Sequence, residues 1–233
     1  MIPISDENPT QLKPLVTWGI IFACVATFLW QLSFSERDGE ALFFALGFVP
    51  STLFDHAVTA NVYGIPWAWL TLITSMFLHG GFLHLGGNML YLWIFGNNVE
   101  DAMGHGRFLI FYLASGIAAA LAEGIVNRHS ALPMVGASGA ISGVLASYVL
   151  IYPRARVTVI IPLGILLYPT KISAFYVIGF WFVLQLLNGV SATPGASGTA
   201  WWAHVGGFAA GFLLTPLLSH FPLFGRYTRG PWG

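Results

Sequence analysis

Four long stretches of this chain contain no charged side chain, and they decide what kind of protein it is. They are residues 14–35, 56–99, 129–153 and 172–225. Each reaches or exceeds the about 20 apolar residues that a helix needs to cross a hydrocarbon core about 30 Å thick. The chain is therefore predicted to be an integral membrane protein.

The composition supports the same prediction and excludes several classes of soluble protein. Of the 233 residues, 56% are hydrophobic and only 8% are charged, whereas a soluble domain has about 25% charged residues. Nine basic residues balance nine acidic ones, so the chain lacks the excess of Lys and Arg expected of a nucleic-acid-binding protein. Disordered chains have a low hydrophobic content, so the composition excludes that class as well.

Six helical spans fit the apolar stretches, which predicts an all-α membrane protein folded as a bundle of six transmembrane helices. The spans are expected at residues 15–34, 82–99, 107–127, 138–152, 171–188 and 200–219. They form one transmembrane domain over 15–219, between a short N-terminus at 1–14 and a short tail at 220–233. The first span is longer than the apolar core of a signal peptide and lacks a small-x-small cleavage site, which indicates that it is retained in the mature protein.

Two further segments are not expected to cross the membrane. Residues 35–69 contain four acidic side chains and are interpreted as a long first loop lying in the interface, anchored by Trp67 and Trp69. Residues 157–169 are rich in β-branched side chains, but two prolines interrupt them and they are too short to cross. No internal repeat is visible, so the sequence does not suggest a transporter built from inverted repeats.

The distribution of basic residues indicates the orientation of the bundle. With the N-terminus in the cytoplasm, seven basic residues lie on the inner side: Lys13, Arg107, Arg154, Arg156, Lys171, Arg226 and Arg229. Only Arg37 and Arg128 then lie on the outer side. Because basic residues are enriched in cytoplasmic loops, both termini are expected in the cytoplasm.

Ser138 opens the fourth span within the sequence GASG. From Ser138 to Tyr152 a helix rises only about 22 Å, so Ser138 is expected below the outer membrane surface. The irregular backbone before it must line a water-filled cavity, because such backbone is not tolerated against lipid. The first turn of a helix also has unpaired N–H groups and the positive end of the helix dipole. These groups are the elements of an oxyanion-binding site.

The fourth and sixth spans each carry a G-x-x-x-G pattern that lets transmembrane helices approach closely. The glycines are Gly139 and Gly143 in the fourth span, and Gly207 and Gly211 in the sixth. Packing of these two faces is expected to bring the Ser138 hydroxyl within hydrogen-bonding distance of the His204 ring. Such a contact is the nucleophile–base pair of acyl transfer, here without an evident acidic residue to orient the histidine.

His84 and Asn88 lie four residues apart on one face of the second span. Side chains of this kind donate hydrogen bonds to a developing oxyanion, and the alternative role is hydrogen bonding between helices. His79 is expected to have a structural role. A metal site formed by His79, His84 and His204 is disfavoured, because no carboxylate lies near them and the spacing is not that of a zinc-binding helix.

Three acidic residues adjoin the second and third spans. Glu100 and Asp101 are expected to pair with Arg107 or with backbone groups. Glu123 is expected to bond to a loop rather than to take part in gating.

Five motifs occur in a specific order and spacing. They are HGGFLHLGGN at 79–88, FGNNVED at 95–101, GASGA at 136–140, YPRARV at 152–157 and AHVGGFAAG at 203–211. On these motifs the chain resembles the rhomboid intramembrane serine proteases over about residues 70–219. The resemblance implies a six-helix bundle with Ser138 as nucleophile and His204 as base. It also implies an oxyanion site formed by the Ser138 amide, His84 and Asn88.

The resemblance further implies the kind of substrate and the membrane. In this family other transmembrane proteins are cut near the outer membrane face without a metal or cofactor, and the fifth helix and the loop after it gate lateral entry. The compact six-span layout and the resemblance together suggest a bacterial-type inner membrane.

The sequence departs from the family at two places. Leu70 and Thr71 stand where many members have Trp-Arg in the first loop, and Ser142 stands where some members have an aromatic residue beneath the catalytic histidine. A hydroxyl, a packed apolar residue or water is left as the group that orients His204.

Two other functions are weighed against proteolysis. A catalytically inactive relative that binds or chaperones membrane proteins would typically lack the serine or the histidine, and both are present here. A channel or transporter would have water access, but the sequence shows neither a repeat nor a polar file reaching the cytoplasmic side.

Overall fold

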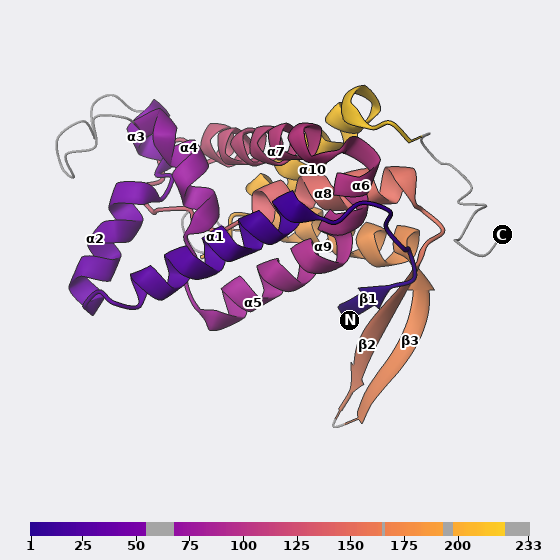
Figure 1. Cartoon of the computed structure of the whole chain (residues 1–233). Coiled ribbons are helices and arrows are strands. Elements are labelled where there is room, and N and C mark those ends of the chain that lie inside the picture. The colour runs from indigo at the N-terminus through magenta and orange to yellow at the C-terminus, as the bar shows by residue number, and fades with distance from the viewer. Residues whose placement is uncertain (55–67, 165, 193–197, 222–233) are drawn as a thin grey trace.

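The computed structural model describes residues 1–54, 68–164, 166–192 and 198–221 of the chain. They form a mostly helical bundle with a small β-sheet at one end (Figure 1). Trp67, expected to anchor the first loop, lies outside the described residues, as do Arg226 and Arg229 of the C-terminal tail.

Helices cover nearly all of the apolar stretches. They are α1 (Leu15–Gln31), α2 (Glu36–Leu46), α3 (Pro50–Phe54), α4 (Thr71–Thr74), α5 (Phe82–Tyr91), α6 (Asn97–Met103), α7 (His105–Val126), α8 (Ser138–Ile151), α9 (Ala174–Ser191) and α10 (Trp201–Leu218). Two 3₁₀ turns, η1 (Ala68–Leu70) and η2 (Ser75–Phe77), flank α4, and a π-helical turn, η3 (Leu92–Gly96), joins α5 to α6 without a break. Each expected span therefore falls on a helix, with ends displaced by a few residues.

Three of these helices are long and apolar enough to cross a membrane, namely α7, α9 and α10. A fourth span results if residues 68–77 and 82–103, two helical segments bent by 83° at the break between them, are counted as one. Helices α1 and α8 are apolar but shorter. The chain is thus an integral membrane protein, and these counts refer to the described part of it.

The first loop contains more helix than the sequence suggests. Residues expected to be a loop form α2 and α3. The Ser35 hydroxyl accepts a hydrogen bond from the Asp38 N–H at 3.3 Å, so Ser35 caps α2 in the manner common for serine at a helix start. Trp69, expected as an interface anchor, has an exposed side chain.

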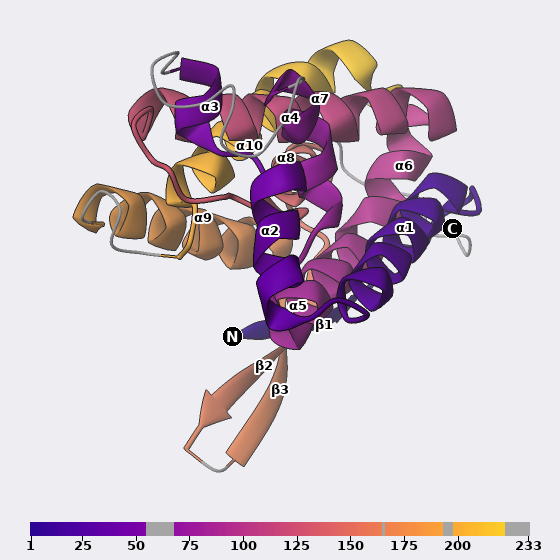
Figure 2. The same ribbon diagram turned by 90° about the vertical axis from the view of Figure 1, so that its left-hand side faces the viewer.

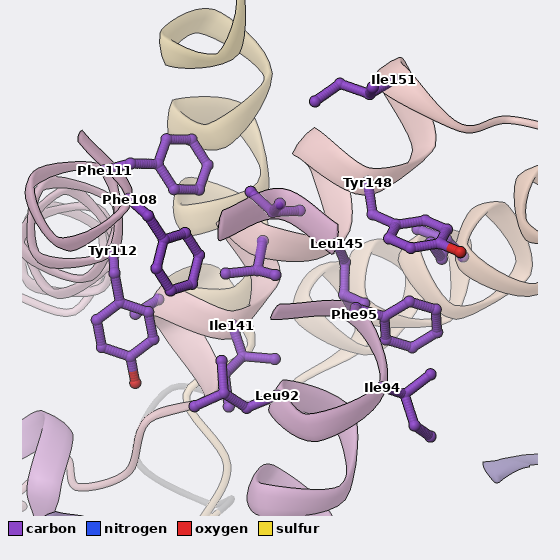
Figure 3. Packing of buried hydrophobic residues seen from close by; sticks show 14 of the residues in the cluster. Leu92, Ile94, Phe95, Phe108, Phe111, Tyr112, Ile141, Leu145, Tyr148 and Ile151 are labelled. Atoms are coloured by element: carbon purple, nitrogen blue, oxygen red, sulfur yellow. The ribbon is translucent and has the colours of Figure 1, made fainter. Parts of the chain in front are cut away.

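The core is built around α8. Every residue of α8 from Gly139 to Tyr148 is buried, because α7, α9, α10 and the α5–α6 segment surround it. Large side chains from η3 and α7 pack on it, and Figure 3 shows Phe95 beside Tyr148 and the aromatic rings of α7 on the opposite side. A helix that apolar neighbours enclose on all sides has a fixed position in the bundle.

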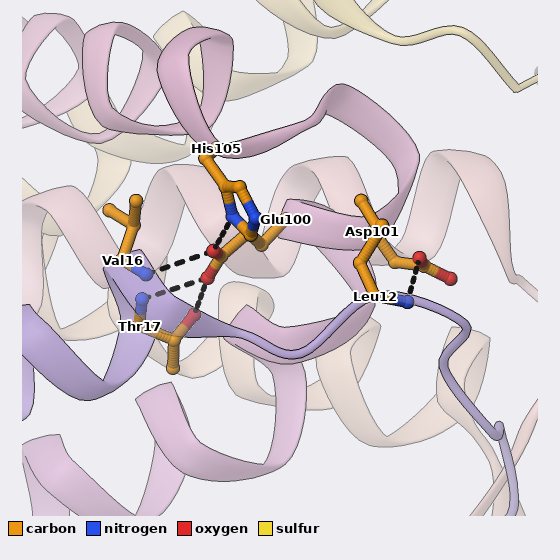
Figure 4. Close-up of polar contacts among 6 residues, drawn as sticks. All are labelled: Leu12, Val16, Thr17, Glu100, Asp101 and His105. Atoms are coloured by element: carbon orange, nitrogen blue, oxygen red, sulfur yellow. Dashed lines mark hydrogen bonds and ion pairs between the residues drawn. The ribbon is translucent and has the colours of Figure 1, made fainter.

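Glu100 and Asp101, both on α6, accept hydrogen bonds from backbone groups of the N-terminal segment (Figure 4). The fully buried Glu100 carboxylate accepts hydrogen bonds from the N–H groups of Val16 and Thr17, at 2.9 and 2.8 Å, and from the Thr17 hydroxyl at 2.7 Å. These N–H groups belong to the first turn of α1 and have no carbonyl partner within the helix. Glu100 thereby caps α1 from another part of the chain.

The acidic pair was expected to bind Arg107 or backbone groups, and the structure shows the backbone groups. Asp101 accepts from the N–H groups of Gln11 and Leu12, and His105 lies 2.5 Å from Glu100. Arg107, the alternative partner, contacts His220 instead.

Replacing Glu100 with Ala is expected to lower the free energy of unfolding by about 2–4 kcal/mol, because buried donors lose a charged acceptor. The thermal unfolding midpoint in detergent measures the loss. Glu40→Ala, on the exposed surface of α2, is the control and is expected to leave the midpoint unchanged. Equal midpoints for both variants would contradict the capping role.

The expectation of an all-α protein is wrong at one end of the bundle. A three-stranded antiparallel sheet in the order β1-β2-β3 joins β1 (Ile2–Asp6), β2 (Arg156–Leu163) and β3 (Leu166–Ser173). Strands β2 and β3 form the hairpin between α8 and α9, with Val157 opposite Ile172 and Leu163 opposite Leu166. Gly164 at the turn has φ +62°, a backbone conformation that glycine adopts without strain.

The sheet is tied to the bundle where β1 crosses the end of α8. The Tyr148 hydroxyl donates a hydrogen bond to the Asp6 carboxyl at 2.6 Å. Burial raises the pKa of Asp6 to about 6. The carboxyl therefore keeps its proton to higher pH than an exposed aspartate, which reduces the cost of burying it.

Candidate active site

The site forms where the first turns of α8 and α10 meet. Ser138 is the first residue of α8, and His204 lies in the first turn of α10. The Ser138 Oγ lies 2.8 Å from the His204 Nε2. The structure thus brings these two residues into hydrogen-bonding contact across 66 positions of sequence.

The two glycine faces allow this approach. A Cβ added at Gly207 would collide with the carbonyl oxygen of Gly139, and one added at Gly211 would collide with the backbone of Gly143. The backbones of α8 and α10 are therefore in direct contact at both levels, as the two G-x-x-x-G patterns predict. Any larger residue would separate the helices that carry Ser138 and His204.

A residue that the sequence does not single out completes the histidine's surroundings. The Gln185 side chain, from α9, lies with its Oε1 2.8 Å from the His204 Nδ1. Its Nε2 donates to the Trp181 carbonyl at 3.2 Å. A carbonyl only accepts, so this bond assigns the amide nitrogen to Trp181 and the oxygen to His204. The Nδ1 then carries the proton, and the Nε2 is free to accept from Ser138.

Aromatic rings hold the imidazole from the sides. The ring centroids of Trp181 and Trp201 lie 5.9 and 6.1 Å from that of His204. Ser142, at the position where some rhomboids have an aromatic residue, instead donates from its hydroxyl to the Ser138 carbonyl at 2.7 Å. The sequence left a hydroxyl, a packed apolar residue or water as the group that orients His204, so the amide of Gln185 was not predicted.

The other departure from the family lies in the first loop. The Thr71 hydroxyl donates to the Ala68 carbonyl at 2.6 Å, and the Thr74 hydroxyl donates to the Leu46 carbonyl at 2.6 Å. The second bond connects α4 to the end of α2. The hydrogen bonds that hold this part of the loop therefore come from neutral hydroxyl groups, because the chain has no arginine there.

His84 and Asn88 line the same cavity as Ser138 and His204, a space of about 600 Å³ between α5, α8, α9 and α10. The His84 Nδ1 accepts from the Gly80 N–H at 3.4 Å, so a neutral ring carries its proton on Nε2. The Nδ2 of Asn88 is buried and has no partner among the described residues. His84 and Asn88 therefore each have a side-chain N–H for which the described residues supply no acceptor.

Gly136 brings the chain close to these donors just before α8. It has φ +122°, and a Cβ there would lie 2.6 Å from the His84 Nε2 and 3.5 Å from the Asn88 Nδ2. A side chain at this position would fill the space in front of both donors. Ser138, two residues later, opens α8, so its N–H has no carbonyl partner within the helix.

Glu123 and His79 hold the elements around the cavity. The Glu123 carboxylate accepts from the Ala203 N–H at 3.1 Å and from the Asn127 amide at 2.6 Å, so it caps the helix that carries His204. His79 is buried and exchanges two backbone hydrogen bonds with the Gln31 side chain of α1. No group of three His, Cys, Asp or Glu side chains suited to a metal ion occurs in the described ranges.

Comparison with known proteins identifies the family. A family model described as the rhomboid domain matches residues 66–221, more than half of the chain. The chain belongs to the rhomboid family. The matched range begins before α4 and ends after α10, so it contains the whole candidate site.

Individual relatives come from different organisms and compartments. "Rhomboid-like protein 11, chloroplastic" of Arabidopsis thaliana is 30% identical over 66% of the chain and 54% of its own length. "Rhomboid protease GluP" of Bacillus subtilis is 34% identical over 64% of the chain and 26% of its own length. "Rhomboid protein 1, mitochondrial" of Saccharomyces cerevisiae is 37% identical over 38% of the chain and 27% of its own length.

The chain thus spans about half of the length of the plant relative and about a quarter of the other two. The organelle relatives do not favour a bacterial inner membrane over other membranes. In this chain the range that matches the rhomboid domain contains the helices that are long and apolar enough to cross a membrane.

Gly207→Ala is expected to lower the thermal unfolding midpoint in detergent, because overpacking a well-packed contact costs about 1–3 kcal/mol. The control is Gly179→Ala in α9, where a Cβ would meet no atom within 4 Å. A midpoint that falls for the control as much as for Gly207→Ala would show that the backbone contact is not what holds α8 and α10 together.

Proposed function

We propose that this rhomboid is a serine endopeptidase that hydrolyses peptide bonds in or next to transmembrane segments of membrane-protein substrates. The observation that carries the proposal is the 2.8 Å contact between the Ser138 Oγ and the His204 Nε2. A serine hydroxyl is a weak nucleophile until a base accepts its proton, and a neutral imidazole is such a base.

The reaction would proceed in two steps. Ser138 attacks the scissile carbonyl while its proton passes to the His204 Nε2, and the protonated ring then gives that proton to the leaving amine. An ester between substrate and Ser138 results. Water from the cavity next attacks this ester while His204 takes its proton. The ring then gives that proton to the departing Ser138 oxygen, which releases the acid product and restores the free enzyme.

The charge that develops on the carbonyl oxygen needs hydrogen-bond donors. We assign this role to the Ser138 N–H, the His84 Nε2 and the buried Asn88 Nδ2, which has no partner in the described part of the chain. Each such donor is worth about 3–4 kcal/mol of barrier where it has been measured in a hydrolase. The positive end of the α8 dipole adds to the same field.

We assign Gln185 as the positioning residue for His204. Its amide oxygen accepts from Nδ1 and so keeps the Nε2 lone pair directed at Ser138. An amide provides the orientation that a carboxylate gives in other serine hydrolases, without placing a further charge inside the bundle.

We also propose that the chain crosses the membrane six times, through the four candidate spans identified by helix length and through the shorter helices α1 and α8. Both termini would be cytoplasmic, as the distribution of basic residues indicates. The substrates would be transmembrane proteins that enter from the side of the bundle, and no metal or cofactor takes part. The bacterial inner membrane stays a prediction from the sequence.

A fluorophosphonate probe tests the nucleophile without knowledge of the substrate. We expect it to label the wild type, not to label Ser138→Ala, and to label His204→Ala at least about a hundredfold more slowly, as for loss of a general base. Ser147→Ala is the control, because Ser147 is another serine of α8 and is buried. Its labelling should equal that of the wild type.

Labelling that survives Ser138→Ala would refute the assignment of the nucleophile. A folded wild type that is not labelled, in detergent and in lipid, would refute the protease and favour the alternative function. That alternative is a catalytically inactive rhomboid that binds or chaperones membrane proteins.

The role of Gln185 is tested by the dependence of the labelling rate on probe concentration. Gln185→Leu should lower the maximal rate about tenfold, the value of one hydrogen bond of about 1.4 kcal/mol, with little change in the half-saturating concentration. Gln185→Glu keeps an acceptor and should retain most of the rate. If both variants react equally at equal thermal midpoints, Gln185 does not position the histidine.

A further inference from the structure

The β2–β3 hairpin projects away from the helices, and both views of the molecule show its far end beyond the bundle (Figures 1 and 2). The side chains near that end are apolar and exposed. Leu166, Leu167 and Tyr168 expose 69%, 66% and 59% of their surface. Such an apolar group at the end of an arm requires a partner other than water.

One face of the hairpin continues the protein core. Val157 and Val159 of β2 are completely buried, and Ile161 and Ile172 pack against the same core cluster. Because alternate residues of a strand share a face, and Ile161 pairs with Tyr168, the exposed Tyr168 extends this face past the bundle. The surface beside a bundle of transmembrane helices is the lipid bilayer.

Charge is distributed along the hairpin as at a membrane surface. From Val157 to Thr170 there is no charged residue, whereas Arg154 and Arg156 lie exposed at its base, next to Lys171, which pairs with Glu7. Basic residues suit the level of the anionic headgroups, and apolar and aromatic residues suit the boundary with the acyl chains. Phe175 and Tyr176, exposed at the start of α9, lie immediately after the hairpin.

The backbone limits how deep the hairpin goes. Strand β3 is at the edge of the sheet, and an open edge is not tolerated in the hydrocarbon core. At the interface water still reaches such an edge. Pro169 of β3 also lacks an N–H that would need a partner.

We propose that the β2–β3 hairpin is an interfacial anchor that lies in the lipid leaflet at the end of the bundle where α8 ends and α9 begins. Under the proposed orientation this is the cytoplasmic leaflet. The anchor fixes the depth of the base of α9 in the bilayer. It rests on the placement of the sheet beside membrane-spanning helices and is independent of the proposed protease activity.

The test uses a fluorophore that reports polarity, attached to Tyr168→Cys in a full-length chain whose only natural cysteine, Cys24, is replaced by alanine. The protein is reconstituted in vesicles of phosphatidylcholine and phosphatidylglycerol, with or without lipids that carry a doxyl quencher on the acyl chain below the headgroup. We expect blue-shifted emission and strong quenching by doxyl. The same label at Arg154→Cys, at the base of the hairpin, should show red-shifted emission and little quenching.

Leu167→Cys serves as a second label position if Tyr168→Cys does not give a monodisperse helical protein. Emission and quenching equal to those of the Arg154 label would overturn the proposal. A blue shift without doxyl quenching that disappears when the protein is diluted in lipid would also overturn it, and would identify a second copy of the chain as the partner.

Discussion

The close contact between the backbones of α8 and α10 is the constraint on which the rest of the structure depends. Hydrophobic burial gives little preference between helices that are already in lipid, so their association relies on packing. Gly139 and Gly207 provide that packing because neither has a side chain to keep the carbonyl oxygens and Cα atoms apart. The separation between the starts of the two helices follows from it, and with it the distance from Ser138 to His204.

Two carboxylates provide the hydrogen-bond acceptors that the N–H groups in the first turns of two apolar helices lack. Glu100, on α6, caps α1, and Glu123, on α7, caps α10. In each case a buried negative charge meets the positive end of a helix dipole and its unpaired N–H groups, so that each compensates the cost of burying the other. Two of the few charges in the chain therefore fix how separate helices enter the bundle.

The sequence was sufficient for the helices and for the contact between Ser138 and His204, because apolar length and glycine spacing are local patterns that report directly on packing. Gln185 could not be found in this way, since a single glutamine in an apolar span has no pattern and its partner lies on another helix. The sheet was missed for a related reason. Val157, Val159 and Ile161 alternate as a strand does, but two prolines interrupt the segment, and β1 pairs with β2 from the other end of the chain.

Helix α8, which carries Ser138, differs in its relation to lipid from α9 and from α10, on which Phe212, Leu213 and Leu217 are exposed. Helix α8 is enclosed by protein, whereas α9 exposes large side chains such as Phe180 and Leu187 along its length. Helices α9 and α10 therefore respond directly to a mismatch between their hydrophobic length and the thickness of the bilayer, whereas α8 does not. Since α9 carries Gln185, a tilt of this helix changes the hydrogen bond on the His204 Nδ1 while Ser138 stays in place. Under the proposed function, the composition of the membrane would then affect the rate of the reaction through this hydrogen bond.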